Sequence, residues 1–327
     1  MNIETIKTRV QFEQILKDFA PVLYGQHNLP NLLCHEAIDK NFDQGFVLYA
    51  NNETKATACV IKNPDLFFKN EKAVCIAFYE CVEDIRIAEK LLHSAVDYCK
   101  EQGYKYLICP MNGSTWNAYR FAVEPITDSY ISEPFHKSYY ANQFENFGFE
   151  ILAEYITQID TTLHLPDAPK ILNKEITFRT LDKNNYETEM KTIFAFCKDI
   201  FYNNFLYTEI SENAFLEKYM ALKNIINPNF VIIAEDKGEV VGLILALHDH
   251  YCQHSKRIIV KTLARKRGER YAGVAHELSR RITMLALQLN YQSILHAFMH
   301  QANASTNISR LFSGEPFRKY KLYYTAV

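Results

Sequence analysis

Helix-spaced apolar positions mark the clearest element of the chain, in its last quarter. They recur at spacings of four, four, three and four, at Val274, Leu278, Ile282, Leu285 and Leu289. This is the period of one buried helical face. A β-branched run at 258–264 comes shortly before and predicts a strand. The pattern therefore predicts a strand, a turn at 270–275, and a helix from Val274.

The same order of elements occurs earlier in the chain. Apolar strands at 46–50 and 56–61 predict a hairpin like that at 230–247, where Lys237 and Gly238 form the turn. A strand at 73–79, a helix at 84–102 and a strand at 104–109 then match the strand, helix and strand of the second half. Both series end in Asn-x-Ser-Thr, at Asn112 and at Asn303, and each Asn is expected to precede a short helix. The chain therefore contains an internal repeat of about 150 residues.

Two prolines, Pro166 and Pro169, interrupt the pattern between the repeats. We therefore predict a domain at 1–163, a linker at 164–175 and a second domain at 176–327. The mixture of strands and helices in each repeat predicts the α/β (α+β) class.

Composition narrows the functional classes. The chain has 327 residues, 48% hydrophobic and 23% charged, with a net charge of −2. The nearly neutral charge argues against a dedicated nucleic-acid partner, and the sequence contains neither a leader segment nor an apolar run that would span a bilayer. Eight scattered cysteines show no zinc-ligand spacing and are expected to be reduced core residues. We therefore expect a cytoplasmic protein without a metal site.

The turn before the predicted helix carries candidate chemistry. It consists of Arg270, Tyr271, Ala272, Gly273, Val274 and Ala275. Unpaired N–H groups and the dipole at a helix N-terminus attract a pyrophosphate, while Gly273 permits close approach and Arg270 adds charge. The glycine pattern matches neither a P-loop nor a dinucleotide fingerprint. The alternative is a solvated basic loop.

The Arg-x-x-Gly-x-Ala pattern after a strand resembles the acyl-CoA-binding signature of the GNAT N-acetyltransferase superfamily. The strand at 176–181 and Asn303 extend this resemblance over most of 176–327, and Phe144 to Phe149 resembles the end of a GNAT domain in the first half. The resemblance implies two tandem GNAT-like lobes, each a mixed, mostly antiparallel twisted sheet flanked by helices. The first lobe has the acidic segment 80–84 where a cofactor turn would stand, so it is expected to have lost that site.

The resemblance also implies acetyl-CoA as cofactor and a small-molecule or peptide amine as acceptor. The expected cofactor-binding residues are Thr262, Leu263, Ala264, the six residues Arg270 to Ala275, Asn303 and Ser305. In such enzymes backbone N–H groups on the strand before the turn meet the thioester carbonyl.

The catalytic residues are less clear. The position where many superfamily members carry an acidic tyrosine falls near Arg310, so Tyr320 and Tyr323 are substitutes, although tyrosines at alternating strand positions are commonly packing residues. Asp249 and His300 are candidate general bases, with His248 and His296 as further choices; each is equally a polar residue at a strand end. The aromatic segment at 116–121, which includes Trp116 and Arg120, would line an acceptor pocket or pack in the core.

Three functions follow. The first is an N-acetyltransferase. The second is a non-catalytic acyl-CoA sensor, which the missing tyrosine favours. The third is an aminoacyl-tRNA-dependent transferase of the Fem or leucyl/phenylalanyl type, which the acidic pI of about 6.6 and the intact cofactor turn disfavour. The sequence indicates neither the acceptor nor the oligomeric state.

Overall fold

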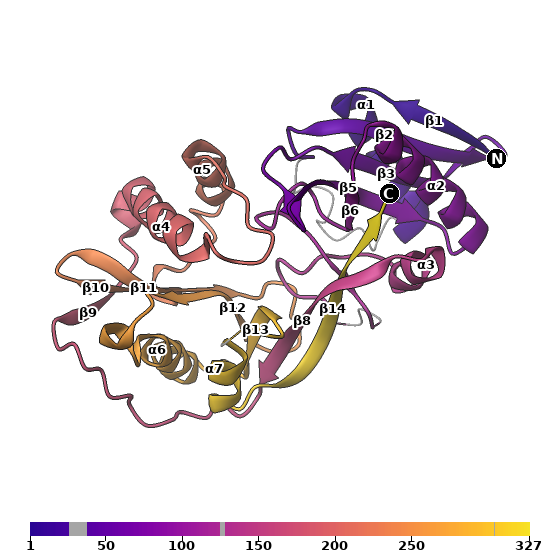
Figure 1. Ribbon diagram of the computed structural model, residues 1–327. Helices are drawn as coiled ribbons and strands as arrows, with labels where there is room; N and C mark the ends of the chain where they lie inside the picture. The colour runs from indigo at the N-terminus through magenta and orange to yellow at the C-terminus, as the bar shows by residue number, and fades with distance from the viewer. Residues whose placement is uncertain (26–37, 125–127, 304) are drawn as a thin grey trace.

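A computed structural model describes residues 1–25, 38–124, 128–303 and 305–327, arranged as two lobes side by side (Figure 1). The first half forms β1 (Asn2–Ile6), α1 (Arg9–Tyr24), β2 (Phe42–Ala50), β3 (Glu53–Ile61), β4 (Phe67–Phe68), β5 (Glu71–Cys81), α2 (Ile85–Glu101), β6 (Tyr106–Cys109), β7 (Phe121–Ala122), α3 (Tyr140–Phe147) and β8 (Glu150–Asp160). The second half forms β9 (Ile176–Thr180), α4 (Tyr186–Phe201), α5 (Glu212–Met220), β10 (Val231–Asp236), β11 (Glu239–His248), β12 (Arg257–Arg265), α6 (Val274–Gln288), β13 (Ser293–His300), α7 (Ser305–Leu311) and β14 (Glu315–Ala326).

The predicted repeat is present as two similar series of elements. The hairpin turn falls at Lys237 and Gly238, both in the left-handed region, and helix α6 begins at Val274 as the periodicity predicts. One expectation was wrong. No helix follows Asn112, whose side-chain oxygen instead accepts a hydrogen bond from the N–H of Asp39 and whose carbonyl accepts one from Asn117.

The strands join into one continuous sheet in which the halves exchange strands. Along the sheet the order is β1-β2-β3-β5-β6-β14-β8-β13-β12-β11-β10-β9. Strand β14 pairs with β6 of the first lobe, and β8 pairs with β13 of the second. Each lobe is thus completed by a strand from the other half of the sequence, while the boundaries at 163 and 176 stay a prediction.

Helices cover both faces of this sheet. In the first lobe α1 packs on one face, while α2 and α3 pack on the other against a core that includes Leu91, Phe144 and Tyr323. In the second lobe α4 and α5 cover one face and α6 and α7 the other (Figure 1). The helical layer therefore leaves the ends of the central strands accessible at the junction of the lobes.

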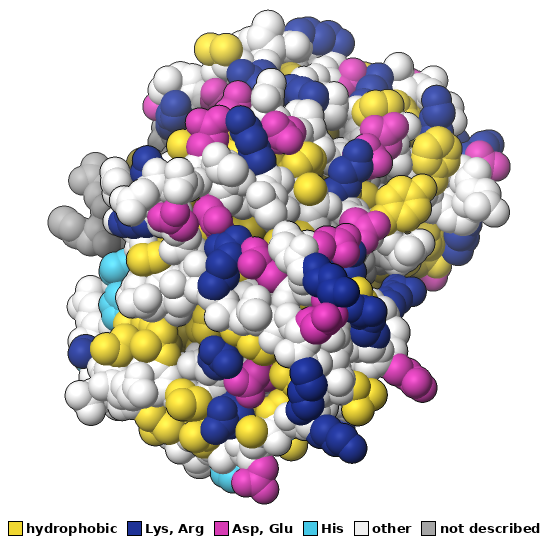
Figure 2. Space-filling model, turned by 90° about the vertical axis from the view of Figure 1, so that its left-hand side faces the viewer, with side chains coloured by type: hydrophobic (Ala, Val, Ile, Leu, Met, Phe, Trp, Pro, Cys, Tyr) yellow, Lys and Arg dark blue, Asp and Glu magenta, His cyan; other side chains and the backbone are white. Residues whose placement is uncertain are grey.

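The structure shows the state of the cysteines and the distribution of surface charge. Six described cysteines are buried and Cys252 is partly so, all as free thiols; Cys34 lies outside the described residues. Within the described ranges, no group of His, Cys, Asp and Glu residues is arranged to hold a metal ion, and no helix is long and apolar enough to cross a membrane. On the face drawn in Figure 2, basic and acidic side chains are interspersed.

Candidate functional site

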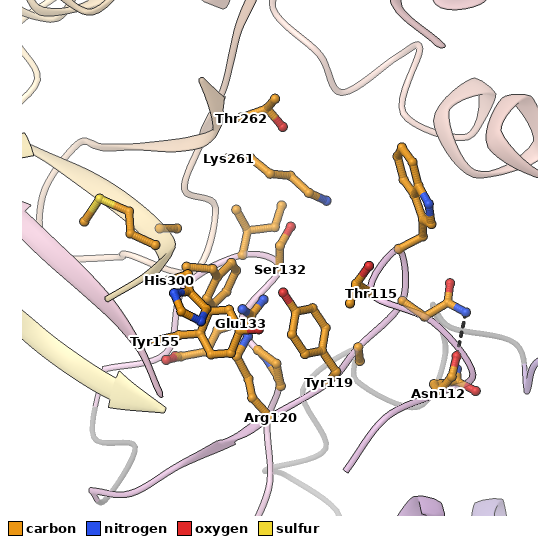
Figure 3. Close-up of a pocket in the computed structure, with 18 of the residues that line it drawn as sticks. Asn112, Thr115, Tyr119, Arg120, Ser132, Glu133, Tyr155, Lys261, Thr262 and His300 are labelled. Atoms are coloured by element: carbon orange, nitrogen blue, oxygen red, sulfur yellow. Dashed lines mark hydrogen bonds between the residues drawn. The ribbon is translucent and has the colours of Figure 1, made fainter. Parts of the chain in front are cut away.

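A cleft lies at the junction of the lobes. Its volume is about 1030 Å³, and it is lined by both halves of the chain. Side chains from the segments 112–121 and 131–133, from β8 and from β12 and β13 converge on it (Figure 3). This volume is at the upper end of the range for small-molecule sites.

One wall of the cleft is the point where two parallel strands separate. Strands β12 and β13 pair from Arg257 with Ser293 to Val260 with His296, and the pairing stops there. A register shift against β11 leaves Lys261 as an extra residue, so β12 bulges where it leaves its neighbour. Lys261, Thr262 and Leu263 line the cleft beyond this point. The expected segment Thr262 to Ala264 therefore carries backbone that β13 does not cover.

The helix after β12 begins without a cap. Gly273 is its N-cap residue and provides no side-chain hydrogen bond. The first helical bond is from the N–H of Glu277 to the carbonyl of Gly273, and in the described part of the chain the N–H groups of Val274, Ala275 and His276 have no acceptor. Ser279, one turn beyond Ala275 on the same face of α6, lines the cleft. This end of α6 thus presents backbone N–H groups of the kind that can bind an anion, and the predicted pyrophosphate site stays a prediction.

Arg270 and Gly273 do not have the roles in the turn that the sequence predicts. The guanidinium of Arg270 pairs with the buried Asp236 at 2.7 Å, so its charge is already compensated. A Cβ added at Gly273 would lie 2.9 Å from the carbonyl oxygen of Lys170 in the linker, and the φ of Gly273 is +84°. Glycine is therefore required at position 273 by the backbone of Lys170, which packs on the turn, and an anion at this helix end would depend on backbone N–H groups.

The corresponding helix of the first lobe is capped by its own sequence. Asp84 accepts a hydrogen bond at 2.9 Å from the N–H of Arg86 in the first turn of α2. Glu80 lies near this end of β5, where its carboxyl group accepts hydrogen bonds from Tyr24 and Tyr140. A phosphate would meet a carboxylate at this helix end instead of free N–H groups.

Three predicted residues lie together at the end of β13 and the start of α7. His300, Asn303 and Ser305 all line the cleft. Asn303 accepts a hydrogen bond from the N–H of Ser305 and so begins α7. The ring of His300 packs edge-on against Tyr155, and its Nδ1 accepts from the N–H of Ala302 at 3.2 Å. His300 thus offers an imidazole to the cleft from a fixed position.

His296 lies deeper in the cleft, where the strands separate. Burial lowers its pKa to about 4, so the imidazole is neutral at neutral pH. Its Nδ1 forms a hydrogen bond with the hydroxyl of Ser309 on α7. Ser309 lines the cleft, whereas Arg310, the position found by counting from Asn303, is exposed. Gly314 is needed because a Cβ there would lie 2.2 Å from the hydroxyl oxygen of Ser309.

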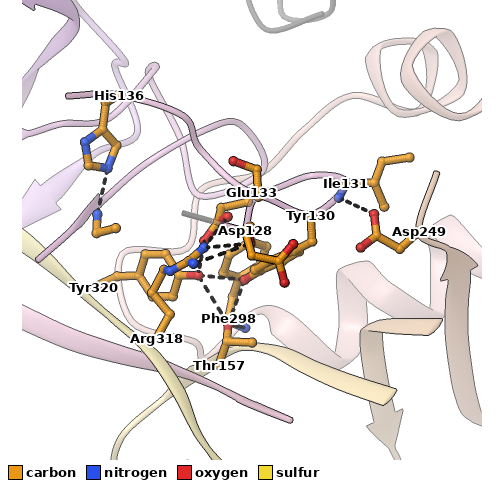
Figure 4. Close-up of polar contacts among 12 residues, drawn as sticks. Asp128, Tyr130, Ile131, Glu133, His136, Thr157, Asp249, Phe298, Arg318 and Tyr320 are labelled. Carbon is orange, nitrogen blue, oxygen red and sulfur yellow. Dashed lines mark hydrogen bonds and ion pairs between the residues drawn. The ribbon is translucent and has the colours of Figure 1, made fainter. Parts of the chain in front are cut away.

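Asp249 is a structural residue and not a general base. It is fully buried and does not line the cleft. Its carboxylate pairs with Arg257 at 2.7 Å and accepts from the N–H groups of Ile131 and Tyr251 (Figure 4). Because each oxygen is already engaged, Asp249 fixes the loop that carries Ser132 and Glu133.

The two substitute tyrosines are also withdrawn from the cleft. Tyr323 is buried in the first-lobe core and donates to Glu145. Tyr320 donates to Glu133 at 2.6 Å and lies 2.7 Å from the hydroxyl of Tyr130, and burial raises its pKa well above the usual range (Figure 4). Neither tyrosine reaches a ligand in the cleft, so neither serves as its proton donor.

The cleft contains residues that sequence patterns do not single out. Glu133 and Tyr155 line it from a loop and from β8, and Arg120 lies between them (Figure 3). Trp116 lines it as well and donates to the carbonyl of Thr208 in the second half, so the aromatic segment belongs to the cleft. The only signal for Arg120 in the sequence is its place in that segment.

Comparisons with known proteins agree on the architecture. No protein-family model matches the sequence, and a search of curated proteins gives no significant match. Solved structures do match over nearly the whole chain. A GCN5-related N-acetyltransferase from Sphaerobacter thermophilus gives a TM-score of 0.58 at 11% identity, covering 99% of this chain and 95% of that one. A tandem GNAT protein from the clavulanic acid biosynthesis pathway gives 0.57 at 8% identity, with 99% and 98% covered.

The chain has a tandem GNAT fold. A probable N-acyltransferase from Enterococcus faecalis is similar too, with a TM-score of 0.60 at 8% identity over 100% of this chain and 72% of that one. At these identities the likeness extends to the GNAT fold alone. The fold and the class of each lobe are therefore as the sequence predicts, and the chemistry must be argued from the cleft.

Proposed function

We propose that this tandem GNAT protein transfers an acetyl group from acetyl-CoA to an amine. The observation that carries the proposal is the separation of β12 from β13 beside the uncapped N-terminus of α6. A helix end with free N–H groups suits a pyrophosphate, and a gap between parallel strands suits an extended arm. The gap opens toward the cleft, and from α6 the residue that lines the cleft is Ser279, in the second turn of the helix.

Different residues of the second lobe would then bind different parts of acetyl-CoA. The N–H groups of Val274, Ala275 and His276 would hold the pyrophosphate, and Thr262 to Ala264 would line the arm. Asn303 and Ser305 lie on the other side of the gap, at the start of α7. Acetyl-CoA supplies an acetyl group activated as a thioester. The first lobe lacks an equivalent site because Asp84 already caps α2.

The chemistry requires few side chains. The acceptor amine must lose a proton before or as its nitrogen bonds to the carbonyl carbon, and His300, whose imidazole lines the cleft, would accept it. Backbone N–H groups at the bulge of β12 would stabilise the charge that develops on the carbonyl oxygen. The C–S bond then breaks, and the sulfur leaves as a thiolate that takes up a proton. His296 stays neutral and, with Ser309, provides a polar wall beside the gap.

The matched pair Ala275→Asp and Ala275→Asn tests acetyl-CoA binding. Asp in the first turn favours a helix, so the fold should remain stable while the added charge repels the pyrophosphate. We expect isothermal titration to show binding by the wild type, a loss of about tenfold or more for Ala275→Asp, and a smaller loss for Ala275→Asn. Equal affinities in all three proteins, or no binding by the wild type, would exclude the proposed site.

A non-catalytic acyl-CoA sensor is the second candidate. The withdrawal of Tyr320 and Tyr323 from the cleft favours it, since neither of these two tyrosines is then placed to protonate the thiolate. Release of free thiol in the presence of amines separates the two functions. An enzyme releases thiol in proportion to amine, and His300→Gln should lower its kcat by about 10²-fold or more. A sensor binds acetyl-CoA without release, and its behaviour is unchanged in His300→Gln.

A further inference from the structure

Arg120 is a buried cation for which the described residues provide no carboxylate partner. Its side chain lines the cleft, only 7% of the residue is exposed, and it immediately precedes the short strand β7. In the part of the chain that the structure describes, Nε and Nη1 of Arg120 have no hydrogen-bond acceptor, and no carboxylate lies within ion-pair distance. A buried guanidinium with unused N–H groups is costly unless a ligand satisfies it.

Aromatic rings hold this guanidinium in place. Its central carbon lies 3.9 Å from the ring centre of Tyr119, 4.3 Å from that of Phe298 and 4.7 Å from that of Tyr155. These rings come from the same loop, from β13 and from β8, so the site exists only where the exchanged strands meet. Stacking stabilises the cation through its faces but leaves the in-plane N–H groups unused.

The charge of Glu133, an acidic residue that also lines the cleft, is already matched. Glu133 accepts bonds of 2.5 and 2.6 Å from Nη1 of Arg318 and one of 2.6 Å from Tyr320. The charge of Glu133 is therefore matched by Arg318, and the charge of Arg120 remains. The backbone of Arg120 is held in the left-handed region at φ +78°, with its N–H bonded to Pro110. This backbone conformation, which is uncommon for a non-glycine residue, fixes the direction in which the side chain leaves the loop.

We propose that Arg120 binds a carboxylate of the acceptor, so that the acceptor is an amino acid or peptide and not a simple amine. This inference rests on the acyltransferase function proposed above. A planar guanidinium pairs with a carboxylate through parallel N–H bonds, and one unmatched positive charge suits one monoanion. Anchored there, an acceptor directs its amine into the cleft that His300 and the β12–β13 gap also line (Figure 3).

The first test compares carboxylates with amides that differ only in charge. Binding of a mixture of N-acetyl L-amino acids, the expected products, is measured by saturation-transfer NMR with and without acetyl-CoA, beside the matched N-acetyl amino acid amides. The acids should bind to the wild type and the amides should not. In Arg120→Met binding of the acids should fall by about tenfold or more, and Arg120→Lys should keep part of it. Equal binding of acids and amides, or unchanged binding in Arg120→Met, would overturn the proposal.

Two further measurements separate the possible failures. Acetyl-CoA affinity should be the same in Arg120→Met and the wild type. If the wild type binds acetyl-CoA but no N-acetyl amino acid, the carboxylate site is wrong and the acyltransferase proposal stands. If the acids bind but acetyl-CoA does not, the carboxylate site stands and the acyltransferase proposal is wrong. A phosphate group could also pair with a guanidinium. Thiol release is therefore measured with phosphoethanolamine in place of amino acids, and a preference for phosphoethanolamine would also overturn the proposal.

Thermal melting tests the role of Arg120 in the unliganded protein. Because its charge is buried without a carboxylate partner among the described residues, Arg120→Met should melt at the same temperature as the wild type or above it. A clear fall in melting temperature would show that Arg120 is a structural residue, and that result would contradict the proposal.

Discussion

Glu80 illustrates how one buried side chain sets a pH dependence. Its carboxyl group lies in the cleft wall of the first lobe and accepts hydrogen bonds of 2.6 and 2.7 Å from Tyr24 and Tyr140. Burial raises its pKa from 4.5 to about 7, an effect that these two hydrogen bonds reduce but do not cancel. The folded state therefore holds a proton that the unfolded state releases.

The raised pKa of Glu80 determines the direction in which the free energy of unfolding changes with pH. Between pH 4.5 and about 7 the folded protein binds more protons at Glu80 than the unfolded chain does, so this contribution to the free energy of unfolding falls as the pH rises through that window. Glu80→Gln should remove this fall. Urea unfolding of both proteins at several pH values measures it: wild type minus variant should decrease from pH 5 to 7 and then level off. A constant difference would mean that Glu80 is ionised throughout.

At the scale of elements, the position of α6 depends on a glycine in β11. A Cβ added at Gly242 would lie 2.6 Å from a methyl group of Val274, the first residue of the helix. The first turn of α6, where we propose the pyrophosphate binds, is therefore held in place by direct contact with a strand. Gly45 in β2 has an equivalent contact in the first lobe, where a Cβ would lie 2.6 Å from the ring of Phe12.

These two glycines provide a matched comparison. Gly242→Ala and Gly45→Ala should each destabilise the protein by about 1–3 kcal/mol through overpacking, as measured by urea unfolding. Only Gly242→Ala should also weaken acetyl-CoA binding, because only it moves the N-terminus of α6. Equal weakening in both variants would indicate a general loss of stability and no local effect on the site.

At the scale of the molecule, the continuous sheet joins the lobes into one cooperative unit. The single tryptophan, Trp116, reports on their junction, since its ring packs against Phe201, Tyr207 and Phe215 of the second half. Because β8 and β14 each complete the opposite lobe, neither lobe unfolds without disturbing the other.

We therefore expect one unfolding transition. Tryptophan emission and far-ultraviolet circular dichroism, followed in the same urea titration, should give the same midpoint. The variant Trp116→Phe, which has no tryptophan, provides the background for the emission measurement. A tryptophan transition that precedes the loss of secondary structure would show that the lobes separate first.

Local patterns predicted the elements well and the site only in part. The start of α6 and the turn at Lys237 and Gly238 follow from spacing and turn chemistry within a few residues. Arg120 depends instead on rings that β8 and β13 bring together, and no local pattern encodes that meeting. Tyr320 and Asp249 were chosen as reactive groups by residue type, but their partners, Glu133 and Arg257, are known only from tertiary packing.

The exchange of β14 also sets an order of events during synthesis. This strand is translated after every other strand of the sheet, yet it fills the place between β6 and β8. At 5–20 residues per second the second half takes about 10–30 s to emerge, and during that time β6 presents an open edge. A nascent chain in this state is a natural client for ribosome-associated chaperones. Rare codons in the second half should therefore lower the yield of a correctly folded first lobe.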